Sequence, residues 1–572
     1  MKFQKIISIS AIVLMVVALA ACKKFLDPPL KGVYDLNQLK NKKGISGLLV
    51  TAYSTLDGRE GSISEGASNW EWGSMAGGDA YKGTEFTDRV DDNPIMRFEL
   101  TPANPLVNAK WDATFDGIGQ ANNVLKLLPD VTDMTETEKK VAEAQARLIR
   151  SHHHFEGVKM WGKIPFIDET TTDYKGGTNS APIWPNIEAD FQFAYDNLPE
   201  ITQYKGQANK WAAAAYLAKA YMFQKKFAEA KALLTTIIAN GKNSQGVKYA
   251  LTDNYQDNFI VTKENNSETV FAIQFSYGDG STSNGNSDNL LNFPHGGGSK
   301  PGGCCGFFQP SQALVNAYKT EGGLPLLDTW NDVSVPSDEA VLSNQPFTPY
   351  AGPLDPRLDW TIGRRAVPYH DWGTHPGRDW IRDVTYGGPY SPKKNTYFKG
   401  DLGATAGVVG WGFGSTALNY TIIRYADILL LAAEAEVEVG SLATATEYVN
   451  LVRARAAKYA PSNTAPYYQP ASAATYANYN VGLYPTFASQ DFGRKAVRFE
   501  RKIELGMEGH RFFDLVRWGI AAADMNAYLA KEGVRRPTTL QGTNFTAGKH
   551  EVYPIPQSVV TNIPGIVQNP GY

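Results

Sequence analysis

The segment 432–449, AAEAEVEVGSLATATEYV, carries the pattern that decides the fold. Ala433 lies before a turn at Gly440, and Leu442, Ala445 and Val449 follow that turn at helical spacing. Small residues at such positions let two helices approach each other, and the larger ones fill the groove to the next pair. This arrangement is typical of a tetratricopeptide-like helix pair.

An earlier segment repeats the same spacing with Ala218, Phe227, Ala230 and Leu234. The two copies are far apart in the chain, so they do not form a tandem solenoid. We therefore expect a mainly α-helical fold in which such pairs are separated by loops and together form a scaffold.

Other helices are predicted in the first half of the chain. Thr135 and Glu138 have capping-box spacing, which predicts a helix that begins there and runs towards Trp161. Apolar residues at helical offsets predict a partner helix over 105–128. The segment 268–275 reads as one short strand.

Composition excludes several classes of protein. Of the 572 residues, 43% are hydrophobic and 20% are charged, which excludes a disordered chain and a multispan membrane protein. The 55 Lys and Arg residues nearly balance the 58 Asp and Glu residues, for a net charge of −3. A nucleic-acid-binding protein would show a basic stripe, so we expect no nucleic-acid partner.

The N-terminus predicts a lipid anchor. Lys2 and Lys5 precede the apolar stretch Ile6–Leu19, as in a secretory signal peptide. The sequence Leu19-Ala20-Ala21-Cys22 resembles the bacterial lipobox, which predicts cleavage of residues 1–21 and acylation of Cys22. Several acyl chains would hold the protein at a membrane surface. The alternative is an ordinary signal peptide followed by a chance cysteine.

Long stretches rich in Gly, Pro, Ser and Asn lie between the helices, at 278–310, 321–420 and 459–490. They are also rich in aromatic residues, in which disordered linkers are poor, so we expect folded loops. The last segment, 553–572, is rich in proline, and we expect it to lack regular structure and to pack across the body.

Two of the Gly-rich regions mix aromatic rings with polar side chains, which suits carbohydrate capture. A sugar ring has an apolar C–H face that stacks on Trp or Tyr, and a hydroxyl rim that bonds with Asp or Asn. The alternative is that the rings pin these loops onto the helices. The candidate ligand-binding residues are Asn69, Trp70, Trp72, Asp79 and Tyr81 in one region and Tyr369, Asp371, Trp372 and Trp380 in the other.

Cys304 and Cys305 are adjacent and are flanked by glycines. Outside the reducing cytosol they could close a vicinal disulfide that acts as a small apolar platform. Two reduced, buried thiols are the other interpretation.

Other apparent chemical motifs have structural explanations. Consecutive residues of a helix point about 100° apart, so His152, His153 and His154 cannot converge on one metal ion. Glu500, Glu504 and Glu508 are spaced to share one helical stripe, with Arg501 and Arg511 nearby. This favours an ion-pair network between helices over a glycosidase pair. The sequence contains no phosphate loop, nucleophile elbow or zinc-protease helix, so we expect no cofactor, no metal and no catalysis.

Several segments together resemble the SusD/RagB family of Bacteroidetes surface lipoproteins. They occur in the family's order along nearly the whole precursor, and the combination is highly specific. The segments are the lipobox with Phe25-Leu26-Asp27, Asp355-Pro356-Arg357-Leu358, Ile423-Arg424-Tyr425-Ala426-Asp427, Asn450-Leu451-Val452-Arg453-Ala454-Arg455, Arg498-Phe499-Glu500-Arg501, Glu508-Gly509-His510-Arg511-Phe512-Phe513-Asp514 and Gln568-Asn569-Pro570-Gly571-Tyr572.

The resemblance implies a mainly α SusD-like fold, with four tetratricopeptide-like helix pairs packed against an irregular, loop-rich half with few short strands. Residues 22–265 would form the N-terminal region and 266–572 the C-terminal region. Family members sit on the outer membrane facing outward, cap a SusC-like TonB-dependent transporter and help to capture oligosaccharides. Some are thought to bind peptides instead, and a surface glycoside hydrolase is an alternative of another class. One departure is Lys23-Lys24 after the cysteine, where surface-exported relatives often have acidic residues.

Overall fold

The computed structural model describes residues 36–59, 62–280, 285–410 and 412–572. The predicted signal peptide, the predicted lipidation site Cys22 and the loop residue Trp411 lie outside these ranges. No helix within the described ranges is long and apolar enough to cross a bilayer.

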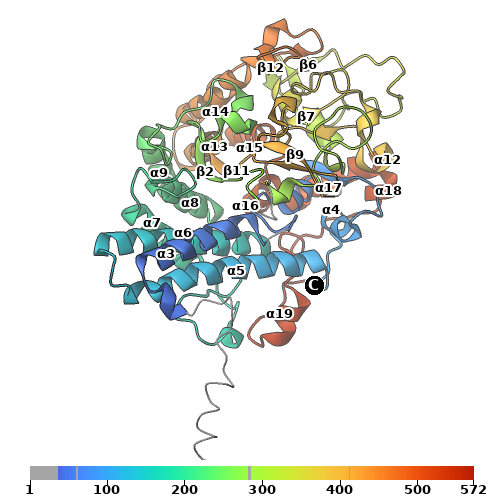
Figure 1. The fold of residues 1–572 in the computed structure, drawn as a ribbon. Coiled ribbons are helices and arrows are strands. Elements are labelled where there is room, and N and C mark those ends of the chain that lie inside the picture. The colour runs from blue at the N-terminus through green and yellow to red at the C-terminus, as the bar shows by residue number, and fades with distance from the viewer. Residues whose placement is uncertain (1–35, 60–61, 281–284, 411) are drawn as a thin grey trace, which may run out of the picture.

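Long helices packed side by side form the first half of the chain (Figure 1). Thr135 caps the second of the two longest, because its hydroxyl accepts the N–H of Glu138 while the Glu138 carboxylate accepts the N–H of Thr135 at 2.8 Å. This helix and its partner confirm the predictions for 135–161 and 105–128. The helices are α3 (Lys42–Ser54), α5 (Pro105–Leu127), α6 (Glu136–Trp161), α7 (Trp184–Asn197), α8 (Lys210–Phe223) and α9 (Phe227–Asn240).

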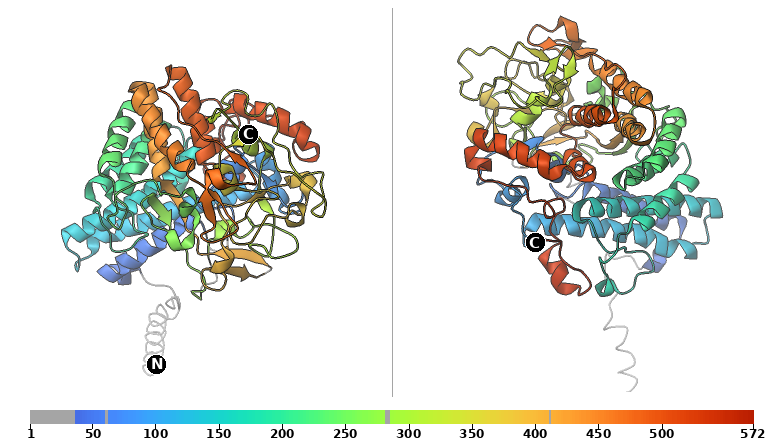
Figure 2. Two further views of the ribbon diagram at one scale, coloured as in Figure 1. Left: turned by 90° about the horizontal axis from the view of Figure 1, so that it is seen from above. Right: turned by 180° about the vertical axis from the view of Figure 1, so that it is seen from behind.

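The two tetratricopeptide-like segments form two packed helix pairs. Helix α8 packs against α9, and α13 (Tyr425–Val439) packs against α14 (Leu442–Ala456). Helix α9 also packs against α13, so the two copies are neighbours in space despite their distance in the chain. The prediction of a mainly α scaffold is confirmed. Seen from behind, α8 and α9 lie on the side away from the long loops (Figure 2).

The C-terminal helices α15 (Gln490–Glu504), α16 (Arg511–Trp518) and α17 (Ala521–Arg535) complete the frame. A buried charge cluster lies at the end of α15 and ties the frame to the loop half. Glu504 binds Arg424 at 2.6 Å and Arg357 at 2.8 Å. The cluster consists of Glu268, Asp355, Glu500, Glu504 and Glu508 with Arg357, Lys394, Arg424, Arg453 and Arg455.

The predicted network of glutamates is therefore confirmed, but two of its details were wrong. Helix α15 ends at Glu504, so Glu508 lies beyond the helix rather than on its stripe. The neighbouring arginines also have other partners: Arg501 binds Asp427 and Asp514, and Arg511 binds Asp524.

Short elements connected by irregular backbone make up the loop half. Each sheet among the described residues has two strands, and the predicted strand within 268–275 is observed as one of them. The pairs are β1 (Ala80–Gly83) with β3 (Phe307–Pro310), β2 (Thr269–Ile273) with β11 (Tyr420–Arg424), β4 (Thr320–Glu321) with β5 (Leu324–Pro325), β6 (Pro353–Leu354) with β14 (Asn478–Tyr479), β7 (Ile362–Gly363) with β8 (Ser391–Pro392), β9 (Ala406–Val409) with β10 (Phe413–Thr416), and β12 (Tyr459–Pro461) with β13 (Tyr468–Pro470).

Six short α-helices also occur in the described ranges, four of them within the loops and two near the C-terminus. They are α4 (Asn93–Met96), α10 (Gln312–Ala317), α11 (Arg357–Thr361), α12 (Val384–Gly387), α18 (Pro537–Leu540) and α19 (Gln557–Asn562).

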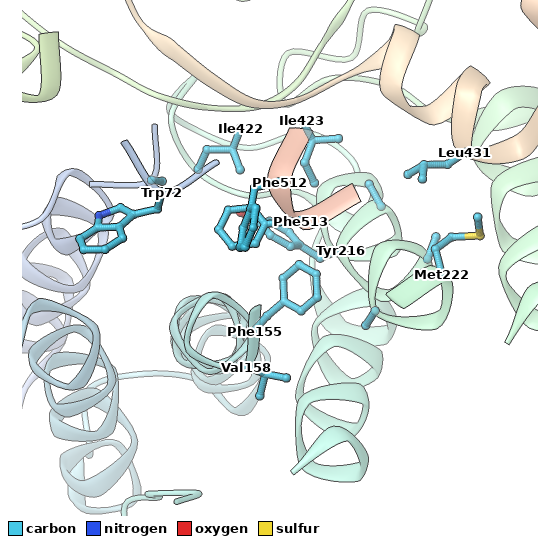
Figure 3. Packing of buried hydrophobic residues seen from close by; sticks show 14 of the residues in the cluster. Trp72, Phe155, Val158, Tyr216, Met222, Ile422, Ile423, Leu431, Phe512 and Phe513 are labelled. Atoms are coloured by element: carbon cyan, nitrogen blue, oxygen red, sulfur yellow. The ribbon is translucent and has the colours of Figure 1, made fainter. Parts of the chain in front are cut away.

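The main core lies where the helices meet residues 66–82, which we call the first aromatic loop. Figure 3 shows Trp72, Phe155, Tyr216 and Phe512, which belong to one buried cluster although they come from segments far apart in the sequence. The Tyr216 ring packs edge-on against His152, whose Nδ1 lies 2.8 Å from the Tyr216 hydroxyl. Apolar packing thus fixes the frame on which the loops rest.

The C-terminal segment packs across the body, as predicted. The Trp161 indole N–H donates to the carbonyl of Pro554 at 3.1 Å, and Asn569 donates back to the Trp161 carbonyl at 3.0 Å. The expectation that this segment lacks regular structure was wrong for its middle, where α19 forms directly after Pro556. Proline is tolerated just before a helix because its missing N–H is not needed there.

Candidate functional site

The first aromatic loop is buried, which corrects the prediction for its two tryptophans. Trp70 and Trp72 lie in a short π-helix, Trp70–Met75, with exposed fractions of 3% and 1%. The Trp72 indole donates to the carbonyl of Ser64 at 2.9 Å, and its ring packs edge-on against Tyr553. Rings covered in this way hold the loop on the core and offer no face to a ligand.

The three polar candidates of this loop are also buried and have internal partners. Asn69 donates to Glu156 at 2.8 Å, and Asp79 accepts the N–H of Met507. The Tyr81 hydroxyl donates to Glu532. Burial raises the pKa of Asp79 to about 6, against the opposing effect of Lys502 and Arg511. These contacts are structural, so the predicted ligand role of this loop is not supported.

Tyr369 and Trp380 of the second aromatic region are buried as well. Trp380 packs edge-on against Tyr369 and His375, and the Tyr369 hydroxyl donates to the carbonyl of Pro392. The prediction that Tyr369 and Trp380 contact a ligand is therefore not supported. Their rings are covered, as those of the first loop are, and offer no face to a ligand.

Trp372 and Asp371, in contrast, are only half-buried. The Trp372 indole donates to the carbonyl of Tyr397 at 2.9 Å, and its ring packs edge-on against the Tyr397 ring. Asp371 accepts the backbone N–H groups of Lys399 and Gly400. One aromatic ring is thus fixed at the surface beside a carboxylate, and these two residues remain ligand-binding candidates.

A second exposed ring, which the sequence reasoning missed, is Phe86. It is 54% exposed and packs edge-on against Tyr386. Its loop is held by Arg382, which binds Glu85 at 2.8 Å and Asp88 at 2.7 Å. The signal in the sequence was a phenylalanine among polar residues directly after a buried strand.

A glycine-rich turn lies between these two exposed rings. Thr84, in the Phe86 loop, donates its N–H to the carbonyl of Gly306, and Gly302 donates to the hydroxyl of Tyr397, the residue that holds Trp372. Cys304 and Cys305 lie within this turn and are joined by a disulfide, one of the two alternatives left open by the sequence.

We call this surface the loop face and define it by its partly exposed side chains. Burial and the nearby positive charges of Arg382 and Lys300 lower the pKa of His295, so its imidazole is neutral at neutral pH. The residues of the loop face are Phe86, His295, Lys300, Cys304, Asp371, Trp372, Arg382 and Phe413.

The structure also has a large groove on the helical side, of about 990 Å³, that the sequence did not predict. It runs between α3, the start of α6 and the loop 198–208. Val50, Ile201 and Tyr204 are its most exposed apolar residues, at 69%, 60% and 62%. Its lining is mixed: aliphatic residues and neutral amides predominate, the rings are Tyr53, Tyr204 and Phe275, and the charged residues are Lys42, Asp57 and Glu138.

The groups that resemble catalytic or metal sites have separate partners. Glu500 and Glu504 have no exposed surface and are held by arginines. The rings of His152 and His153 contact Tyr216 and Thr55 respectively. Among the described residues no cluster of His, Cys, Asp or Glu has metal-site geometry.

Comparison with known proteins agrees with this fold. The family described as "SusD family" matches residues 267–572, and the one described as "Starch-binding associating with outer membrane" matches 49–222. A SusD-like protein P2 of Formosa agariphila is 26% identical over 494 residues, covering 84% of this chain and 83% of that protein.

Solved structures show the same fold. A laminarin-binding SusD-like protein is 24% identical with a TM-score of 0.67, covering 93% of this chain and 100% of that one. The surface glycan-binding protein A of Bacteroides thetaiotaomicron, solved with laminarihexaose, is 19% identical with a TM-score of 0.67, covering 92% and 99%.

A helical frame with a loop-rich half defines a SusD-like protein. The chain belongs to the SusD family, since that match alone covers more than half of its residues. The family is one of glycan-binding proteins associated with the outer membrane.

Proposed function

We propose that this protein is a non-catalytic, cell-surface lipoprotein that binds oligosaccharides and delivers them to a SusC-like TonB-dependent transporter. Its anchor would be the acylated Cys22 on the outward-facing side of the outer membrane. The observation that carries the proposal is Trp372, an indole fixed at the surface beside Asp371 in a member of the SusD family.

The chemistry of the loop face suits a sugar. Trp372 and Phe86 supply apolar ring surface for C–H faces, while Asp371, His295 and Arg382 supply acceptors and donors for hydroxyl groups. We expect affinity in the micromolar range or weaker, because a hydrated ligand must lose water to bind and must later be released.

We propose that the protein is not a glycosidase because its candidate carboxylates are buried and paired with arginines. A glycosidase needs two carboxyl groups that flank a bound substrate. Glu500 and Glu504 are instead sealed in the charge cluster, where three arginines hold the pKa of Glu504 far below its usual value against the effect of burial.

Affinity electrophoresis of the mature protein in gels containing polysaccharides tests this proposal. We expect retardation by at least one polysaccharide, and loss of retardation in Trp372→Ala. The matched control is Tyr204→Ala, which removes an exposed ring in the groove and should leave retardation unchanged.

Three outcomes would contradict the proposal. Release of reducing ends would favour the glycosidase, and binding of peptide mixtures with no binding of sugars would favour a peptide-uptake protein. Retardation that is lost in Tyr204→Ala but kept in Trp372→Ala would move the site to the groove.

A further inference from the structure

The Cys304–Cys305 disulfide lies in the middle of the loop face. On one side of its turn, Gly302 donates to Tyr397 at 2.7 Å, and the carbonyl of Tyr397 accepts the Trp372 indole. On the other side, Gly306 lies against the side chains of His295 and Arg382 and accepts the N–H of Thr84. The disulfide therefore separates the Trp372 side of the face from the Phe86 side.

The turn is anchored on its inner side by hydrogen bonds. Cys305 donates its N–H to the carbonyl of Leu291 at 3.3 Å, and Gly306 donates to that of Phe293 at 2.8 Å. Cys304 pairs with Phe413 of β10 through an isolated bridge. Cys305 is buried while Cys304 is partly exposed, so the pair presents one edge outward from a fixed backbone.

Glycines on both sides leave the disulfide as the only side-chain surface between residues 302 and 306. A Cβ at Gly303 would lie 2.3 Å from the carbonyl oxygen of Gly412, and one at Gly302 would lie 2.6 Å from the Phe293 side chain. No larger residue fits there without moving the backbone. A flat ligand can therefore approach the sulfurs without meeting neighbouring side chains of this turn.

The chemistry of a disulfide complements that of the rings. Its sulfurs and methylenes are polarizable and apolar and carry no strong hydrogen-bond donor, so they suit the C–H face of a sugar. Lys300, His295 and Arg382 lie around it with groups that can bond to hydroxyls. An oxidised pair is also the form expected outside the cytosol.

We propose that the Cys304–Cys305 disulfide is a second sugar-contacting platform, which binds one ring of an oligosaccharide while Trp372 binds another. This inference rests on the proposed function and deepens it, because two platforms select oligosaccharides over monosaccharides. It gives the disulfide a binding role, which a purely structural cross-link would not have.

The test uses the mature chain with Cys22→Ser, which leaves Cys304 and Cys305 as the only cysteines. Titration of thiols under native and denaturing conditions should find none before reduction. Two free thiols would overturn the inference at once. A phosphine reductant then converts the S–S bond into two thiols, with the phosphine giving two electrons and water giving two protons and the oxygen of the phosphine oxide.

Binding of laminarihexaose, maltohexaose and xylohexaose is measured by calorimetry for the oxidised protein, the reduced protein and a Cys304→Ala/Cys305→Ala variant. We expect the oxidised protein to bind at least one of them, and both other forms to bind it at least about fivefold more weakly. The double variant should not respond to the reductant, and its unfolding midpoint serves as the check on folding.

The outcomes separate the two proposals. Equal affinity in all three forms overturns the disulfide platform while the proposed function stands. No binding of any of the three sugars by the oxidised protein, together with no retardation by polysaccharides, overturns both. If the double variant does not fold, the comparison of oxidised and reduced wild-type protein decides alone.

Discussion

The two aromatic loops look alike in sequence but serve different purposes in the structure. Both mix tryptophan and tyrosine with aspartate in Gly-rich segments. The first loop is folded into the core, where Trp72 is 1% exposed, whereas the second leaves Trp372 at the surface. The difference shows that aromatic composition identifies a folded loop but not the direction in which its rings face.

The two loops also differ in what holds them. The first is fixed by apolar packing, with Trp72 against Tyr553. The second region is followed by Lys394, which is buried and binds Glu508 of the charge cluster at 2.7 Å. Three kinds of substitution should therefore affect stability and sugar binding differently. They are the removal of a core ring, of a buried charge and of a surface ring.

The largest effect is expected for Trp72→Ala. The change leaves a cavity in the main core and an unpaired carbonyl at Ser64, so the free energy of unfolding should fall by about 3–5 kcal/mol. Denaturant unfolding followed by circular dichroism measures this loss. A loss below about 1 kcal/mol would mean that the first loop is not part of the core.

Arg424→Met tests the ionic anchor of the second loop. It leaves Glu268, Glu504 and Glu508 with one fewer cation in a buried site, which should cost about 3–5 kcal/mol. The matched control is Arg494→Met, which breaks a partly exposed pair with Glu438 and should cost less than about 1 kcal/mol. Equal losses in the two variants would show that the cluster does not anchor the loops.

Acid should destabilise the protein through the same cluster and through the neighbouring Arg501–Asp514 pair. Burial opposes ionisation of Glu504 and Asp514, but their arginine partners lower both pKa values, that of Asp514 to about 2. Stability from such groups is complete above their ordinary pKa near 4 and is lost as the pH falls towards 2. Carboxyl groups whose pKa is raised by burial, such as Asp79 and Glu264, have the opposite sign, but their contribution to stability changes mainly above about pH 4.

Scanning calorimetry between pH 5 and pH 2 checks this expectation. The unfolding temperature should fall steeply below about pH 4, and Arg424→Met should lower the steepness of the fall. An unfolding temperature that is constant down to pH 2 would contradict the role assigned to the cluster.

Trp372→Ala should separate binding from stability. The half-buried ring contributes less to packing than Trp72, so the free energy of unfolding should fall by about 1–2 kcal/mol. Affinity for an oligosaccharide that the wild type binds should fall at least about tenfold, which corresponds to about 1.4 kcal/mol of binding free energy. Calorimetric titration at one temperature gives both affinities, and an unchanged affinity would remove Trp372 from the site.

Phe86→Ala is expected to have the smallest effect. The exposed ring loses one edge contact with Tyr386, so stability should change by less than about 1 kcal/mol. Affinity should weaken about two- to fivefold if Phe86 contacts the ligand at the far end of the loop face. No change in affinity would restrict the site to the Trp372 side.

The sequence predicted the frame well because local patterns determine it. The capping box at Thr135 and the small residues at Ala218 and Ala433 depend on neighbours within one or two helices. Long-range contacts could not be predicted in this way. Nothing near Trp72 in the chain reveals that Tyr553 covers it, and the arginines that bind Glu504 come from three distant segments.

A crystal structure of the mature protein with an oligosaccharide that it binds tests the proposed site most directly. We expect a sugar ring stacked on Trp372, with the chain of sugars continuing across the Cys304–Cys305 turn towards Phe86. A sugar bound instead in the groove beside Val50 and Tyr204, with the loop face empty, would contradict it.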